Sequence, residues 1–105
     1  MTVITAEDFI GSIADSLQYI SFFHPPDFVR AMVRAYEREE SEAARSAIAQ
    51  ILVNSRMAAE GHRPICQDTG IVVVFLKIGM EVRFDSQLPL QDLVDEGVRR
   101  AWNHP

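Results

Sequence analysis

The fold is decided by the stretch RPICQDTGIVVVFL, residues 63–76, where one pattern of hydrophobic residues gives way to another. Its second half, residues 71–76, is continuously apolar and rich in β-branched side chains, which is typical of a strand buried on both faces. Its first half is polar and contains both proline and glycine. We therefore expect residues 62–70 to form a loop that leads into a strand.

The chain before this loop, residues 1–61, has the apolar periodicity of three helices. Thr5 and Asp8 form a capping-box pattern ahead of the first helix. Pro26 suits the first turn of the second helix, and Ser41 suits the N-cap of the third. Gly61 is expected to end the third helix in a left-handed cap. The apolar stripes of the three helices comprise Phe9, Ile13, Leu17 and Ile20, then Val29, Met32, Val33 and Tyr36, then Ala44, Ala47, Ile48, Ile51 and Leu52.

The chain after the loop predicts a hairpin and a further helix. Gly79 and Met80 suit a tight turn, and residues 80–84 alternate between apolar and charged side chains, as in a half-buried strand. Pro89 suits the start of a last helix. The predicted fold is therefore α+β, with three N-terminal helices, a short β-hairpin and a C-terminal helix in one domain of residues 1–105.

The composition of the chain argues against nucleic-acid binding and against a membrane-spanning segment. The 105 residues carry a formal net charge of −5, 48% are hydrophobic, and Lys77 is the one lysine. Such an acidic chain lacks the clustered cations that bind nucleic acid, and its longest apolar run is far short of the ~20 residues that cross a bilayer. With one cysteine and no signal-like start, we expect a cytoplasmic protein with no internal disulfide.

The loop gathers side chains that could carry chemistry. Four side chains that can ligate or hydrogen-bond stand together, from Cys66 to Thr69, and Gly70 permits a positive φ or a close backbone approach. Each has an ordinary interpretation as well. A lone cysteine is more often a small core residue than a ligand, and Asp68 before Thr69 and Gly70 is typical of an Asx-turn. The residue types alone leave both interpretations open.

The hexapeptide Ile65-Cys66-Gln67-Asp68-Thr69-Gly70 resembles the cysteine motif of class I fumarases and the related tartrate dehydratases. The resemblance continues through the apolar strand and into residues 95–101. It implies the N-terminal part of an iron–sulfur hydro-lyase that reversibly hydrates fumarate to malate. It also implies a 4Fe-4S cluster held by three cysteines, of which Cys66 is the first. Asp68 is then the candidate acid/base, and Gln67, Asp68 and Thr69 contact substrate.

The same resemblance sets the expected partners. Two further cysteines must come from the remainder of the chain or from a beta subunit, so we expect this piece alone to be inactive and to lack the cluster. The substrate is a small dicarboxylate, with fumarate/malate and tartrate both open. A homodimer is expected from the exposed edge of the predicted strand at residues 80–84. Arg63 is a candidate clamp for a substrate carboxylate.

Two other functions remain as alternatives. Asp68-Thr69-Gly70 also occurs in aspartic proteases of the retroviral type, although those are built almost wholly of strands and this chain begins with about sixty residues of helical pattern. A non-catalytic helical interaction domain, with Cys66 buried and inert, is the second alternative. His24 and His62 lack a partner at ligand spacing, so we interpret both as surface or capping residues.

Overall fold

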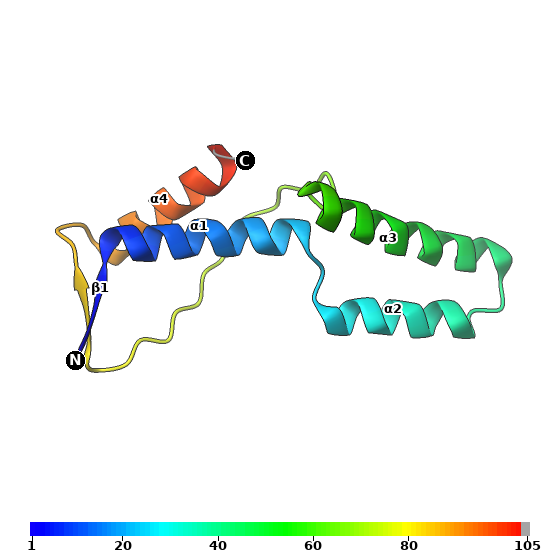
Figure 1. Ribbon diagram of the computed structural model, residues 1–105, viewed down its shortest axis with the longest axis horizontal. Helices are drawn as coiled ribbons and strands as arrows, with labels where there is room; N and C mark the ends of the chain where they lie inside the picture. The colour runs from blue at the N-terminus through cyan, green and yellow to red at the C-terminus, as the bar shows by residue number, and fades with distance from the viewer. Residues whose placement is uncertain (104–105) are drawn as a thin grey trace. The chain divides into compact units, whose positions relative to one another are not determined.

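The computed structural model describes residues 1–103 and contains four helices and two strands among them (Figure 1). The class is α+β, and all four predicted helices are present. In chain order the elements are β1 (Thr2–Thr5), α1 (Ala6–Phe22), α2 (Pro26–Arg38), α3 (Glu42–Gly61), β2 (Val82–Asp85) and α4 (Leu90–Asn103). Among the described helices, none is both long enough and apolar enough to cross a membrane.

The chain groups into two compact units. The first unit comprises Met1–Gln18 together with the chain from Thr69 onward, and the second comprises Tyr19–Asp68. The first unit therefore holds β1, β2, α4 and most of α1. The second holds α2, α3 and the polar loop as far as Asp68.

The strands of the first unit differ from the prediction. β1 and β2 pair in parallel, with Thr2 opposite Val82 and Thr5 opposite Asp85. The predicted hairpin is wrong, because residues 71–79 form neither helix nor strand. The segment after the turn does become a strand, but its partner is the β-branched run Thr2–Thr5. The only expected role in that run was the helix cap at Thr5. Phe9 packs edge-on against Phe84, with ring centroids 5.3 Å apart, and fixes α1 beside the pair.

The core of the first unit lies between α1 and α4. Leu93 is only 1% exposed, and Ile10, Leu17 and Ala101 are also buried. Gly97 of α4 lies so close to α1 that an added Cβ would stand 2.6 Å from Cγ2 of Ile13. The close approach of the two helices therefore depends on a residue without a side chain at this position.

Polar contacts reinforce the same helix pair. Arg100 forms an ion pair with Glu7 across the two helices. The Gln18 side-chain amide donates to the backbone oxygen of Ala101 at 3.1 Å. The predicted cap of α1 is confirmed, because the Asp8 amide donates to Oγ1 of Thr5 at 3.1 Å.

The second unit is built on the antiparallel pair α2 and α3. Pro26 begins α2, and Ser41 caps α3 by accepting from the amide of Ala44 at 3.4 Å, both as predicted. The left-handed cap falls one residue later than predicted, on His62 with φ 49°, while Gly61 stays helical. The His62 ring lies parallel to the Phe22 ring, with centroids 6.0 Å apart.

Candidate functional site

The polar loop is fixed to the second unit immediately before Cys66. The amide of Ile65 donates to the backbone oxygen of Ser21 at 2.9 Å, at the end of α1. The side-chain amide of Asn54, on α3, donates to the backbone oxygen of Ile65 at 2.7 Å. Both backbone groups of Ile65 are therefore engaged, and residues 65–67 form a bend that presents the next side chain.

Cys66 follows this anchored residue and is exposed as a free thiol. Its sulfur lies 4.0 Å from the backbone oxygen of Asp68, the outer limit of a sulfur hydrogen bond. The thiol borders a shallow hollow of about 440 Å³ within the second unit. The residues that line the hollow are His24, Ala47, Gln50, Ile51, Asn54, Ile65 and Cys66.

The three residues after Cys66 are also exposed: Gln67, Asp68 and Thr69. Their side chains are therefore accessible to a small molecule. Gly70 adopts φ 55°, which is one of the two roles that the sequence left open for this glycine. Such a backbone conformation suits glycine and would strain most other residues.

His24 at this site differs from its sequence-based interpretation as a surface or capping residue. Its Nδ1 lies 2.9 Å from the Ser55 hydroxyl, and its ring stacks on Phe28 with centroids 4.5 Å apart. It is half-buried beside Cys66 in the hollow, and not simply a surface or capping residue. The contact joins positions 31 residues apart, so no local spacing could have revealed it. Asn54 was missed for the same reason.

Arg63, the candidate clamp, lies back along the end of α3. A Cβ built on Gly61 would stand 3.6 Å from Cγ and Cδ of the Arg63 side chain. Within the second unit this side chain therefore covers the helix end, and no carboxylate-binding role for it follows from its position.

The chain can supply one thiolate to a metal centre. Cys66 is the only cysteine in the sequence, and residues 1–103 contain no group of three His, Cys, Asp or Glu side chains placed to hold a metal ion. An exposed thiol on an anchored bend fits the requirement for a single cluster ligand, because the side chain can be approached without unfolding its support. The other ligands would have to come from elsewhere.

A second polar cluster lies on α4, in the other unit. Glu96 accepts from Arg99 at 2.6 and 2.7 Å and from Arg100 at 3.0 Å. Hydrogen bonds from Arg99 and then from Arg100 lower the pKa of the Glu96 carboxyl from 4.5 to about 2. With Glu7 bound to Arg100, this cluster ties α4 to α1 and is a structural feature of the first unit.

Comparisons with known proteins agree with the motif. The family model described as fumarate hydratase (Fumerase) matches residues 10–105. A protein of Methanocaldococcus jannaschii, provisionally named as the alpha subunit of an L(+)-tartrate dehydratase, is 32% identical over 89 residues. A protein of Geobacillus stearothermophilus, provisionally named as a class I fumarate hydratase, is 31% identical over 78 residues. No solved structure matches.

The names of the matching family and relatives indicate the hydro-lyase class of enzymes. The chain belongs to the fumarate hydratase (Fumerase) family, as the hexapeptide indicated. The alignments cover 85% and 73% of this chain but only 31% and 15% of the two relatives. The chain therefore spans less than a third of the length of these relatives.

Proposed function

We propose that this chain is the N-terminal part of a class I fumarase-like hydro-lyase that reversibly hydrates fumarate to malate. The observation that carries the proposal is the exposed Cys66 thiol, held on a bend by Ser21 and Asn54, inside the segment that the family model matches. A thiol walled into the core could not serve as a ligand. Its exposure supports this proposal over the non-catalytic alternative, which required a buried cysteine.

Cys66 would hold one corner of a 4Fe-4S cluster as a thiolate, which requires loss of its proton. When bound, such a cluster supplies a Lewis-acidic iron that assists departure of the malate hydroxyl. The chain contributes no second cysteine. In this proposal the remaining ligands belong to the remainder of the enzyme, fused or as a beta subunit, and the chain alone is inactive.

Asp68 is proposed as the group that takes the proton from the carbon next to a substrate carboxylate in dehydration, and returns it in hydration. A carboxylate suits this role if it reaches the substrate directly or through one water. Asp68 lies on the exposed strip beside Cys66, and the neighbouring Gln67 and Thr69 offer an amide and a hydroxyl that can hydrogen-bond a dicarboxylate.

Tartrate is the second candidate substrate. The relative provisionally named as an L(+)-tartrate dehydratase subunit aligns over more of this chain than the relative named as a fumarate hydratase. Malate and tartrate are both dicarboxylates that lose a hydroxyl beside an acidic C–H when they are dehydrated. Groups outside this chain that contact the second hydroxyl of tartrate would set the preference between them.

The test uses the complete enzyme, purified without oxygen, and measures fumarate hydration, malate dehydration and tartrate dehydration separately. We expect activity with one of these substrates, loss of that activity in Cys66→Ser, and a kcat reduced at least about 100-fold in Asp68→Asn. An Asp68→Asn enzyme with wild-type kcat would remove the acid/base assignment, and an enzyme inactive on all three substrates would refute the proposed function.

A further inference from the structure

Residues 71–78 show the alternating exposure of a β-strand but pair with no other strand among residues 1–103. Ile71, Val73 and Phe75 are 90%, 63% and 92% exposed, whereas the intervening Val72 and Val74 are half-buried. This alternation has the period of a β-strand. Yet within residues 1–103 the segment lies outside the β1–β2 pair and makes no backbone hydrogen bond to another segment. Figure 1 shows it as a plain trace between α3 and β2.

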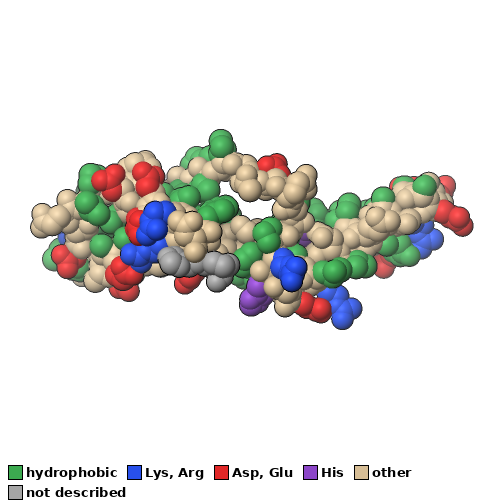
Figure 2. All heavy atoms as spheres, turned by 90° about the horizontal axis from the view of Figure 1, so that it is seen from above, with side chains coloured by type: hydrophobic (Ala, Val, Ile, Leu, Met, Phe, Trp, Pro, Cys, Tyr) green, Lys and Arg blue, Asp and Glu red, His purple; other side chains and the backbone are tan. Residues whose placement is uncertain are grey.

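Such a segment is unfavourable when left open to water. Five of the eight residues expose apolar side chains: Ile71, Val73, Phe75, Leu76 and Ile78. Within residues 1–103 the backbone of the segment has no backbone hydrogen-bond partner in another segment. An exposed, apolar and unpaired stretch of this kind is typical of a site that another chain segment covers. Hydrophobic side chains also lie open on the face shown in Figure 2. Lys77 is the one charged residue in the segment, so the covering surface must be largely apolar and not a charged ligand.

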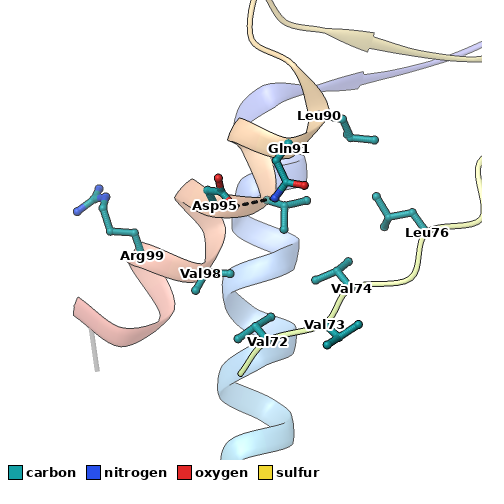
Figure 3. A pocket seen from close by; sticks show the side chains of 10 residues that line it. Val72, Val73, Val74, Leu76, Leu90, Gln91, Asp95, Val98 and Arg99 are labelled. Atoms are coloured by element: carbon teal, nitrogen blue, oxygen red, sulfur yellow. Dashed lines mark hydrogen bonds between the residues drawn. The ribbon is translucent and has the colours of Figure 1, made fainter. Parts of the chain in front are cut away.

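An open groove separates residues 72–76 from helix α4. Val72, Val74 and Leu76 line one wall of an open groove of about 780 Å³, and Leu90, Val94 and Val98 of α4 line the other (Figure 3). All of these residues belong to the first unit. An open groove with apolar walls on both sides is a surface that apolar side chains of another segment can cover.

We propose that residues 71–78 are an interior strand of a sheet whose neighbouring strands come from the remainder of the enzyme. The proposal rests on the proposed function, in which this chain is one part of a larger hydro-lyase. The relative from M. jannaschii is more than three times as long as the aligned region, so ample chain exists to supply these strands.

A second copy of this chain fits the segment less well. Two copies related by a two-fold axis would pair one edge of each segment and leave the other edge bare. A run that is apolar on both faces is typical of a strand with neighbours on both edges and packing on both faces.

The first test is amide hydrogen exchange in the complete enzyme, whose readout needs neither the cluster nor activity. We expect the amides of residues 72–78 to exchange at least about 100-fold more slowly than in an unstructured peptide. Val73→Pro, which removes one amide donor, should abolish this protection. Gln87→Pro, on an exposed loop of the same unit, should leave it intact. Unprotected amides in the wild-type enzyme would overturn the proposal.

A photoreactive benzoylphenylalanine in place of Phe75 identifies the chain segment that covers residues 71–78. We expect its cross-links to map by mass spectrometry to the remainder of the enzyme. The same group in place of Phe9 should cross-link to β2, where Phe84 is its neighbour. Cross-links from position 75 to another copy of residues 71–80, or only to residues of its own unit, would overturn the proposal. An enzyme without hydratase activity that still gave the expected cross-links would refute the proposed function and leave the strand pairing standing.

Discussion

Cys66 owes its position to its neighbour Ile65, whose amide and carbonyl are bound by Ser21 and Asn54. The hexapeptide identified the cysteine but contains no hint of this support, because both anchors lie far away in the sequence. The motif therefore indicates candidate residues for the chemistry, whereas the residues that position Cys66 could not be predicted from it. Asn54 and His24 are found only when helix α3 and the end of α1 are seen together with the loop.

Asn54→Asp tests this support. The variant keeps the size of the side chain but replaces the donating amide with a carboxylate that cannot donate to the Ile65 carbonyl. Loss of a hydrogen bond worth about 1 kcal/mol should speed exchange of the Ile65 amide about fivefold. Gln50→Glu makes the same chemical change in the same hollow and should leave that rate unchanged, because Gln50 does not bind the loop. Equal rates in wild type and Asn54→Asp would contradict the anchoring role.

The Glu96 cluster gives a pH prediction. The pKa of Glu96 is lowered to about 2 by Arg99 and Arg100, so its stabilising effect is complete above the unfolded-state value near 4.5. That effect is lost as the pH falls from 4.5 toward 2. Carbon NMR titration of the Glu96 carboxyl should show this low midpoint. Arg99→Gln should move it upward, and Arg83→Gln on β2, which binds backbone oxygens instead, should not.

Among the secondary-structure elements, the helices follow from local signals and the strands do not. Pro26 and Ser41 begin α2 and α3 as predicted, because a proline ring or a capping hydroxyl acts within one turn. The pairing of Thr2–Thr5 with Val82–Asp85 joins opposite ends of the chain, and no turn residue specifies it. The apolar run at residues 71–76 led to a predicted strand, but no segment of residues 1–103 pairs with it. A segment with strand propensity forms a strand only when another strand pairs with it, and the local sequence does not specify that partner.

The contact between α1 and α4 can be tested at Gly97. Alanine there gains helix propensity but places a Cβ 2.6 Å from Ile13. We expect Gly97→Ala to lower the free energy of unfolding by about 1–3 kcal/mol through overpacking. Gly11→Ala, in α1 with nothing within 4 Å of the new Cβ, should instead raise it by about 0.5–1 kcal/mol. Denaturant unfolding measures the free energy of unfolding of both variants. Equal changes in Gly97→Ala and Gly11→Ala would contradict the close packing of α1 and α4.

The part of the chain that the structure describes buries few large side chains and leaves many apolar ones exposed. Among residues 1–103, seventeen large hydrophobic residues are exposed, from Met1 to Trp102, and the buried hydrophobic core comprises Ile10, Leu17, Ala58, Leu93 and Ala101. Together with relatives much longer than the alignments, this supports a chain that acts as one part of a larger enzyme. Composition alone predicted an ordinary soluble domain, because it cannot show which apolar residues find partners.

The most direct test of Cys66 as a cluster ligand is the iron content of the complete enzyme, reconstituted without oxygen, for wild type and Cys66→Ser. We expect about four irons per active site and the broad visible absorbance of a 4Fe-4S cluster in wild type, with both largely lost in the variant. Gln50→Glu, a change in the hollow beside Cys66 that spares the thiol, should keep both. A Cys66→Ser enzyme with the full iron content and an unchanged spectrum would contradict the assignment of Cys66 as a cluster ligand.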